Sequence, residues 1–144
     1  MPFDLLVVDD SPAMRRLIRR VVDVSGFPIG LFLEAANGNE ALAHLDEHWV
    51  DAVLTDINMP LMDGEAFVRE MRSRPHLNSV PVIVISTDAT DARMNRLHDI
   101  GTQGYVTKPF TAERLRSELE KVLQLPPPGE ESFQEGAFED ELSF

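Results

Sequence analysis

Polar side chains that suit metal and phosphate chemistry stand directly after short apolar stretches of this 144-residue sequence. They are Asp9, Asp10, Asp56, Ser86 and Lys108. Three carboxylates brought together would repel one another, and a hard divalent cation such as Mg²⁺, which prefers oxygen ligands, would relieve that repulsion. A lysine and a hydroxyl beside the cation complete a set of groups suited to phosphoryl transfer, which depends on positioning and charge neutralisation. Aspartate can itself be the nucleophile and form an acyl phosphate. The sequence has no glycine-rich phosphate loop, which argues against a nucleotide as the donor.

The apolar pattern predicts strands and helices that alternate five times along the chain. We expect strands at 3–8, 31–35, 52–55, 81–85 and 104–107, and helices at 12–25, 40–48, 65–72, 91–100 and 112–123. Such alternation predicts an α/β fold with a parallel sheet, right-handed crossovers and helices on both faces. Sites in open sheets of this kind form outside the carboxyl ends of the strands, so the polar side chains are expected to meet there. The strand at 81–85 is the most apolar, and we place it centrally.

Composition excludes several classes of protein. The chain has 13 Lys and Arg against 25 Asp and Glu, a net charge of −12, and no cysteine. An acidic chain is poorly suited to nucleic acid, and the lack of cysteine excludes a disulfide framework, a thiolate zinc site and a cysteine nucleophile. No apolar run reaches the roughly 20 residues of a membrane span, and the first residues have no signal-peptide pattern. We expect a soluble, cytoplasmic protein that inserts into no membrane and binds no nucleic acid.

A change in composition divides the chain into a domain at 1–125 and a tail at 126–144. The tail opens with three prolines, a stiff extended spacer, and holds six of the 25 acidic residues and no Lys or Arg. Its composition is typical of a solvated end, but large apolar side chains lie between the acids. They are Phe133, Phe138, Leu142 and Phe144. We hypothesise that they dock on a protein surface, which could be this domain, a second copy or a distinct partner. We expect a monomer, with self-association through the tail as the alternative.

Several stretches together resemble the receiver domain of response regulators, of the small chemotaxis type. They are residues 7–11, 55–60, 62–64, 81–86 and 104–110, which read VVDDS, TDINMP, MDG, PVIVIS and GYVTKPF. The likeness covers about residues 3–124. It implies a flavodoxin-like, doubly wound sheet of five parallel strands in the order 2-1-3-4-5 with five helices.

The resemblance also implies roles for the acids. Asp56 would accept phosphate from a histidine kinase or a phosphotransfer protein. Asp9, Asp10 and Asp56 would hold Mg²⁺, with the backbone carbonyl of Asn58 as a further ligand. The peptide bond between Lys108 and Pro109 would be cis.

Other residues would contact or report the phosphoryl group. Lys108, Ser86 and Thr87 would contact it, although Thr87 is bulkier than the residue usual in the family and would crowd the entrance. Tyr105 would be the switch that follows Ser86 inward. Two positions would tune dephosphorylation, Asn58 and Asp88.

This reading predicts a two-component phosphorelay switch rather than an enzyme, with slow self-dephosphorylation at most. Its fourth helix, fifth strand and fifth helix would control a protein partner in chemotaxis or motility. The alternatives are a phosphate sink and a phosphate-independent scaffold that acts through the tail. An aspartate-nucleophile phosphatase of the haloacid dehalogenase kind is disfavoured, because those enzymes place the second acid two residues after the nucleophile, whereas Asp9 and Asp10 are adjacent and followed by Ser11.

Simpler roles are expected for other polar and aromatic residues. Asp63 and Asp91 are interpreted as helix caps, and Trp49 as a core or edge residue. His44 and His48 have the spacing of a shared metal site, but no further ligand is near them in the sequence. The basic face of the first helix is interpreted as solvated, with docking of a phosphodonor near this helix as the functional alternative. Its residues are Arg15, Arg16, Arg19 and Arg20.

Overall fold

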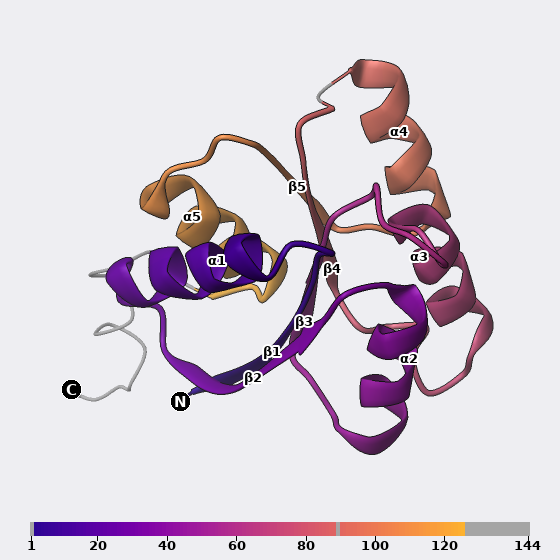
Figure 1. Ribbon diagram of the computed structural model, residues 1–144. Helices are drawn as coiled ribbons and strands as arrows, with labels where there is room; N and C mark the ends of the chain where they lie inside the picture. Colours follow the sequence, from indigo (N-terminus) through magenta and orange to yellow (C-terminus); the bar gives the residue numbers. More distant parts are fainter. Residues whose placement is uncertain (1, 89, 126–144) are drawn as a thin grey trace, which may run out of the picture.

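The structure is a computed structural model that describes residues 2–88 and 90–125. A parallel sheet of five strands in the order β2-β1-β3-β4-β5 forms its middle layer (Figure 1). The strands are β1 Phe3–Val8, β2 Ile29–Ala35, β3 Ala52–Thr55, β4 Val82–Ser86 and β5 Gly104–Thr107. The helices are α1 Pro12–Val24, α2 Gly38–Glu47, α3 Gly64–Ser73, α4 Asp91–Ile100 and α5 Ala112–Val122. The predicted fold class and strand order are confirmed.

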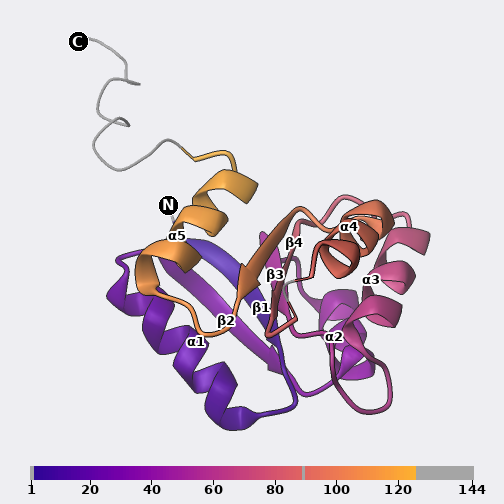
Figure 2. The same ribbon diagram turned by 90° about the horizontal axis from the view of Figure 1, so that it is seen from above.

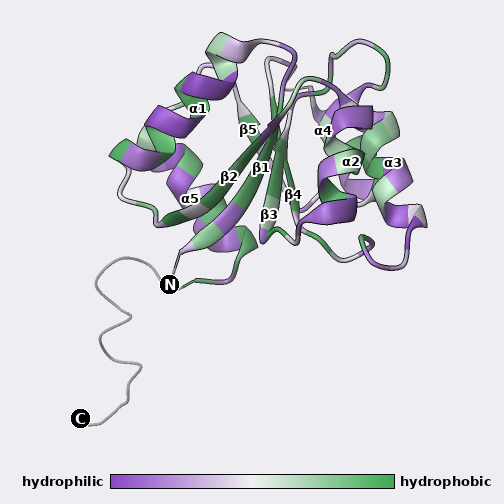
Figure 3. Ribbon diagram, turned by 60° about the horizontal axis from the view of Figure 1, so that its bottom comes forward, coloured by the Kyte–Doolittle hydropathy of each residue, from purple (hydrophilic) through white to green (hydrophobic). Residues whose placement is uncertain are grey.

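Helices cover both faces of the sheet, α1 and α5 on one and α2, α3 and α4 on the other (Figure 2). Successive residues of a strand point to opposite faces. Leu6 and Val8 of β1 therefore pack with α2 and α3, whereas Leu5 and Val7 pack with α1 and α5. The strands are hydrophobic along most of their length, while the helices alternate in hydropathy (Figure 3). Burial on both faces explains why the strands appear in the sequence as continuous apolar runs.

All five helices begin at a residue whose side chain accepts a hydrogen bond from a free backbone N–H of the first turn. These N-caps are Ser11, Asn37, Asp63, Thr90 and Thr111. They fix the loops that leave the carboxyl ends of the strands. In the described part of the chain, no helix is long and apolar enough to cross a membrane.

Two expectations about individual residues are wrong. The cap of α4 is Thr90, because its hydroxyl accepts from the Arg93 N–H, and Asp91 is the first helical residue. Trp49 is 71% exposed, because Val50 beside it takes the buried position before β3. The expectation that the most apolar strand is not at an edge is confirmed, because β4 lies between β3 and β5.

Arg72 of α3 joins three segments through backbone oxygens. Its guanidinium donates to the carbonyls of Leu77 (3.0 Å), Val80 (2.8 Å) and Gly101 (2.7 Å). Gly101 ends α4 in the left-handed conformation, with φ 115°. Burial lowers the pKa of Arg72, and no carboxylate among the described residues forms an ion pair with it. The side chain therefore fastens the α3–β4 loop and the end of α4 to α3.

Replacing this guanidinium with an apolar chain should destabilise the fold. We expect Arg72→Met to lower the free energy of unfolding by about 3 kcal/mol, because several carbonyls lose a charged donor. Arg69→Met, on the exposed side of the same helix, should cost less than about 1 kcal/mol. Urea unfolding followed by circular dichroism measures both changes. Equal losses in the two variants would show that Arg72 makes no special contribution.

Candidate functional site

Three carboxylates meet where two neighbouring strands end. Asp9 and Asp10 follow β1, and Asp56 follows β3, whose last residue lies opposite that of β1 in the parallel register. Each of the three offers an oxygen within 4.8 Å of the others. Asp9 is buried, Asp56 is half-buried and Asp10 is exposed, so the cluster opens to solvent on one side. The acids at the strand ends therefore lie close together, as the sequence predicts.

The backbone holds the two less exposed acids in place. The Asp9 N–H donates to the carbonyl of Ala35, and its Oδ1 accepts from the Ser11 N–H at 2.9 Å. The Asp56 N–H donates to the carbonyl of Val8, and its Oδ1 accepts from the adjacent backbone N–H at 2.6 Å. Each acid therefore uses one carboxylate oxygen locally and leaves Oδ2 to the site.

Lys108 reaches both remaining oxygens from the end of β5. Its Nζ lies 3.3 Å from Asp9 Oδ2 and 3.2 Å from Asp56 Oδ2. Burial acts to lower the pKa of Lys108, but attraction to Asp56 and Asp9 outweighs it, so the pKa is raised and the ammonium stays charged. The peptide bond from Lys108 to Pro109 is cis.

The charge and donor atoms of this cluster suit a divalent cation. One ammonium offsets one of three carboxylates, so two negative charges remain. All the free donors are carboxylate oxygens, the ligands that Mg²⁺ prefers. A small, hard, doubly charged ion would therefore complete the site, whereas the absence of histidine or thiolate donors disfavours zinc.

A second group of side chains holds the loop that follows β4. Ser86 is buried, and its Oγ accepts from the Asp88 N–H at 3.2 Å. The hydroxyl of Tyr105 donates to the carbonyl of Asp88. Burial of the ring raises the pKa of Tyr105. The tyrosine is thus already turned inward, with its hydroxyl on the loop.

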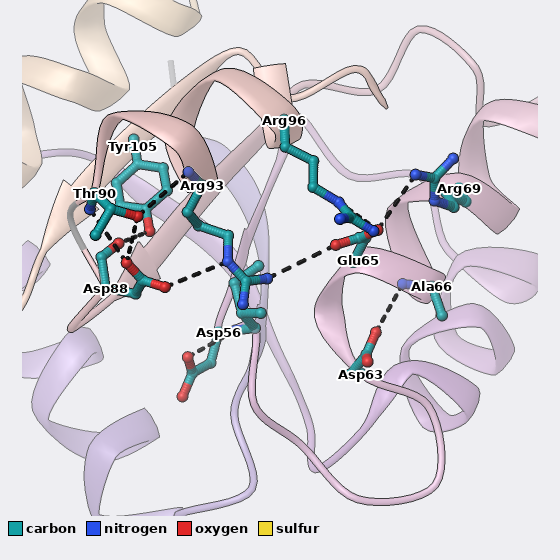
Figure 4. A network of polar contacts seen from close by, with 11 residues as sticks. Asp56, Asp63, Glu65, Ala66, Arg69, Asp88, Thr90, Arg93, Arg96 and Tyr105 are labelled. Carbon is teal, nitrogen blue, oxygen red and sulfur yellow. Dashed lines mark hydrogen bonds and ion pairs between the residues drawn. The ribbon is translucent and has the colours of Figure 1, made fainter. Parts of the chain in front are cut away.

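The same loop is tied to α3 by a network of charges (Figure 4). Arg93 of α4 lies 3.4 Å from the Asp88 carboxylate and 3.7 Å from that of Glu65 on α3. Glu65 also receives Arg96 at 2.7 Å and Arg69 at 3.3 Å, and it is only 15% exposed. The hydrogen bond from Arg96 is the largest influence on Glu65, and its pKa is lowered. Sequence reasoning missed this link, because nothing in the spacing of Glu65 and Arg93 along the chain marks them as partners.

β5 is the edge strand beside this loop, and α5 satisfies its outward backbone groups at Tyr105. Glu118 is buried, and it accepts from the Tyr105 N–H at 3.3 Å and from Arg114 at 2.7 Å. Arg114 also donates to the Tyr105 carbonyl at 3.1 Å. The backbone on either side of the ring is therefore fixed by one ion pair of α5.

Other expected site residues lie around the cluster without closing on it. Asn58 is exposed in the loop after Asp56, and Thr87 is exposed beside Lys108. Asp63 caps α3, its carboxylate accepting from the Ala66 N–H at 2.8 Å. The tail residues Phe133, Phe138, Leu142 and Phe144 lie outside the described residues.

The contacts of Arg15 on α1 differ from those expected for it, and His44 on α2 has a backbone partner. Arg15 is not simply solvated: its side chain is 14% exposed, pairs with Glu34 at 2.8 Å and donates to the carbonyl of Asp9 at 2.5 Å. It thereby helps to hold the loop that carries the acids. His44 contacts the carbonyl of Glu34 through Nε2 at 2.9 Å, and among the described residues neither it nor His48 belongs to a metal-binding cluster.

The sequence and the fold are similar to those of known proteins. Residues 5–120 match the family model described as the response regulator receiver domain. Chemotaxis protein CheY1 of Helicobacter pylori is 40% identical over 120 residues, 83% of this chain and 95% of that protein. Chemotaxis protein CheY of Pseudomonas aeruginosa is 35% identical over the same shares. The structure of Vibrio cholerae CheY4 covers 85% of this chain and 99% of its own, at 29% identity and a TM-score of 0.75. The receiver domain of the sensor histidine kinase PA1611 of P. aeruginosa, which has a magnesium ion coordinated in its active site cleft, shares the fold at 24% identity and a TM-score of 0.75, covering 86% of this chain and 99% of its own.

The charge network around Glu65 should make stability depend on pH. Its folded pKa lies below the usual 4.5, so its contribution is present above that value and is lost as pH falls through the folded pKa. We expect Glu65→Gln to lower the free energy of unfolding by about 1 kcal/mol at pH 7, with the difference from wild type shrinking below pH 4.5.

Urea unfolding at a series of pH values measures this difference. Glu70→Gln is the matched control, because Glu70 lies on the same helix, is 42% exposed and, among the described residues, pairs with Arg74 alone. It should have a smaller effect at pH 7. A pH-independent cost of Glu65→Gln would show that packing rather than charge holds the network.

Proposed function

The chain belongs to the family of response-regulator receiver domains in two-component signalling, and we propose from this that it is a phosphoacceptor switch. Asp56 accepts a phosphoryl group in the presence of Mg²⁺, from a histidine kinase or a phosphotransfer protein in the cytoplasm. The changed domain then controls a protein partner, as in chemotaxis or motility.

One observation carries the proposal: Asp56 shares a lysine with Asp9 at 3.2 and 3.3 Å, beside a third carboxylate. A lone strand-end aspartate would be a poor phosphate acceptor, because the incoming group is itself anionic. Here Lys108 supplies positive charge at the nucleophile, and Asp9, Asp10 and Asp56 supply oxygen ligands. The Asn58 backbone carbonyl is proposed as a further ligand.

The transfer moves a phosphoryl group from nitrogen to oxygen. A carboxylate oxygen of Asp56 attacks phosphorus, the bond to the donor imidazole breaks, and its electron pair stays on the imidazole nitrogen. Bound Mg²⁺ supplies charge neutralisation at the phosphoryl oxygens. Lys108 is already placed to pair with the product, and the backbone hydrogen bonds of Asp9 and Asp56 hold these two carboxylates in position before the transfer.

The product is sensed through the β4–α4 loop. The Ser86 hydroxyl and the exposed Thr87 are the polar groups of that loop proposed to contact the phosphoryl oxygens. If Ser86 turns toward Asp56, the Asp88 N–H loses its acceptor, and the carbonyl of the same residue is the acceptor of Tyr105. A change of charge at Asp56 would therefore affect Tyr105 through Asp88, which contacts both Ser86 and Tyr105. Asp88 and Asn58 are proposed to tune the rate of dephosphorylation.

The surface next to Tyr105 is suited to a protein partner. A hollow of about 280 Å³ lies between α4, β5 and α5 and includes Met94, His98, Tyr105 and Lys121 among its lining. Both apolar and charged groups face it, which is typical of regulated interfaces. The site also favours a switch over a haloacid dehalogenase-type phosphatase, because the residue two after the acceptor is Asn58 and the other acids come from β1.

Loss of the acceptor should abolish phosphorylation. Incubation with acetyl phosphate and Mg²⁺ should label wild type at one phosphoryl group per chain, measured by intact mass, and Asp56→Asn should stay unlabelled. Asp63→Asn is the control, because that carboxylate only caps α3. Labelling of Asp56→Asn, or sustained turnover of acetyl phosphate without a labelled chain, would contradict the proposal.

The Lys108 ammonium and Mg²⁺ compete for the same carboxylates. Replacing Asp10 and replacing Lys108 should therefore change the affinity for Mg²⁺ in opposite directions. We expect Asp10→Asn to weaken Mg²⁺ binding by roughly tenfold and Lys108→Gln to strengthen it by a similar factor, one charge interaction of about 1.4 kcal/mol each. Isothermal calorimetry measures both. Lys108→Gln should nevertheless be labelled more slowly by acetyl phosphate. Unchanged or weaker Mg²⁺ binding by Lys108→Gln would contradict the competition between the lysine and the cation.

A further inference from the structure

The outward face of α1 is a basic surface on an acidic domain. Arg16, Arg19 and Arg20 surround a hollow of about 510 Å³ with Leu17, which is 45% exposed. Arg19 lies 3.4 Å from Asp23. Within residues 2–88 and 90–125, no carboxylate lies within ion-pair distance of Arg16 or Arg20. Two guanidinium groups of this helix are therefore open to a partner outside the described residues.

An apolar hollow lies on the next side of the same helix and ends at the phosphorylation site. Its volume is about 350 Å³, and its walls come from α1 and from the segment after β5. The lining includes Met14, Leu17, Val21, Phe110, Lys108 and Thr87. Leu17 belongs to both hollows. α1 thus presents an apolar strip with a basic rim, leading toward Lys108.

The sequence contains a segment of complementary chemistry. Residues 126–144 hold six of the 25 acidic residues and none of the 13 basic ones, so half of the net charge of −12 lies there. Phe133, Phe138, Leu142 and Phe144 are interspersed among the acids. We propose that residues 129–144 dock in the same chain on this face of α1, the aromatic side chains in the apolar hollow and the acids beside Arg16 and Arg20.

The connection to the domain makes this contact reachable. α1 and α5 cover the same face of the sheet (Figure 2), and Leu125, the last described residue, packs against the core that these two helices share. Three prolines extend about 9 Å at about 3.1 Å per residue. The 16 residues after them reach up to about 50 Å, more than twice the roughly 20 Å length of α1. Tethering makes docking intramolecular, so contacts too weak for a free peptide suffice.

The lack of cysteine allows a direct test in the full chain. A nitroxide label on Ser143→Cys should weaken the amide signals of residues 13–21 in ¹⁵N spectra, with those of α3 unchanged. The loss should diminish when salt rises from about 0.05 M to about 0.5 M, because exposed charge pairs are screened. It should also diminish in Arg16→Glu/Arg20→Glu and persist in Arg16→Lys/Arg20→Lys, which keep the charge.

Other occupants give different results, and each overturns the proposal. Loss of signal that disappears on dilution with unlabelled chain means that the tail binds a second copy. Loss centred on α4, β5 and α5, or none at all, means that α1 is not the docking site. The measurement needs no phosphoryl group, so failure of docking and failure of phosphorylation at Asp56 are separate outcomes.

Discussion

The ammonium of Lys108, shared by Asp9 and Asp56, is the interaction on which the site depends. Carboxylates on adjacent strands cannot approach without a compensating charge. The parallel register of β1 and β3 brings the acids together. The Lys108 ammonium follows β5, which lies on the other side of β4 from these two strands. The order and register of the strands therefore determine whether a positive charge lies beside the acids. An insertion that shifted β5 by one residue would move the Lys108 ammonium away, and the acids would repel one another.

The loop after β4 is connected to three different parts of the molecule through Asp88. Its N–H is bound to Ser86, its carbonyl to Tyr105 and its carboxylate to Arg93, which leads to α3. A residue with three such partners cannot move without breaking at least one contact. This makes the loop suited to a two-state response, because intermediate positions satisfy none of the partners well.

Sequence alone was enough for the order and type of the elements, because each buried strand is an apolar run that ends in a polar residue. It also located Asp9, Asp10, Asp56 and Lys108, because parallel strands end at one edge of the sheet. It could not locate the contacts of Arg72, or those of Arg93 with Glu65, since these depend on side-chain rotamers and on how α3 and α4 pack. Trp49 was misplaced because a large aromatic residue is usually buried, whereas here the neighbouring Val50 fills the space.

β5 is an edge strand, and edge strands tend to recruit strands from other molecules. At Tyr105 both outward backbone groups are already bound, the N–H by Glu118 and the carbonyl by Arg114. A binding partner therefore cannot extend the sheet at this point and has to recognise side chains instead. The same ion pair protects this edge of the sheet against pairing with a strand of another molecule.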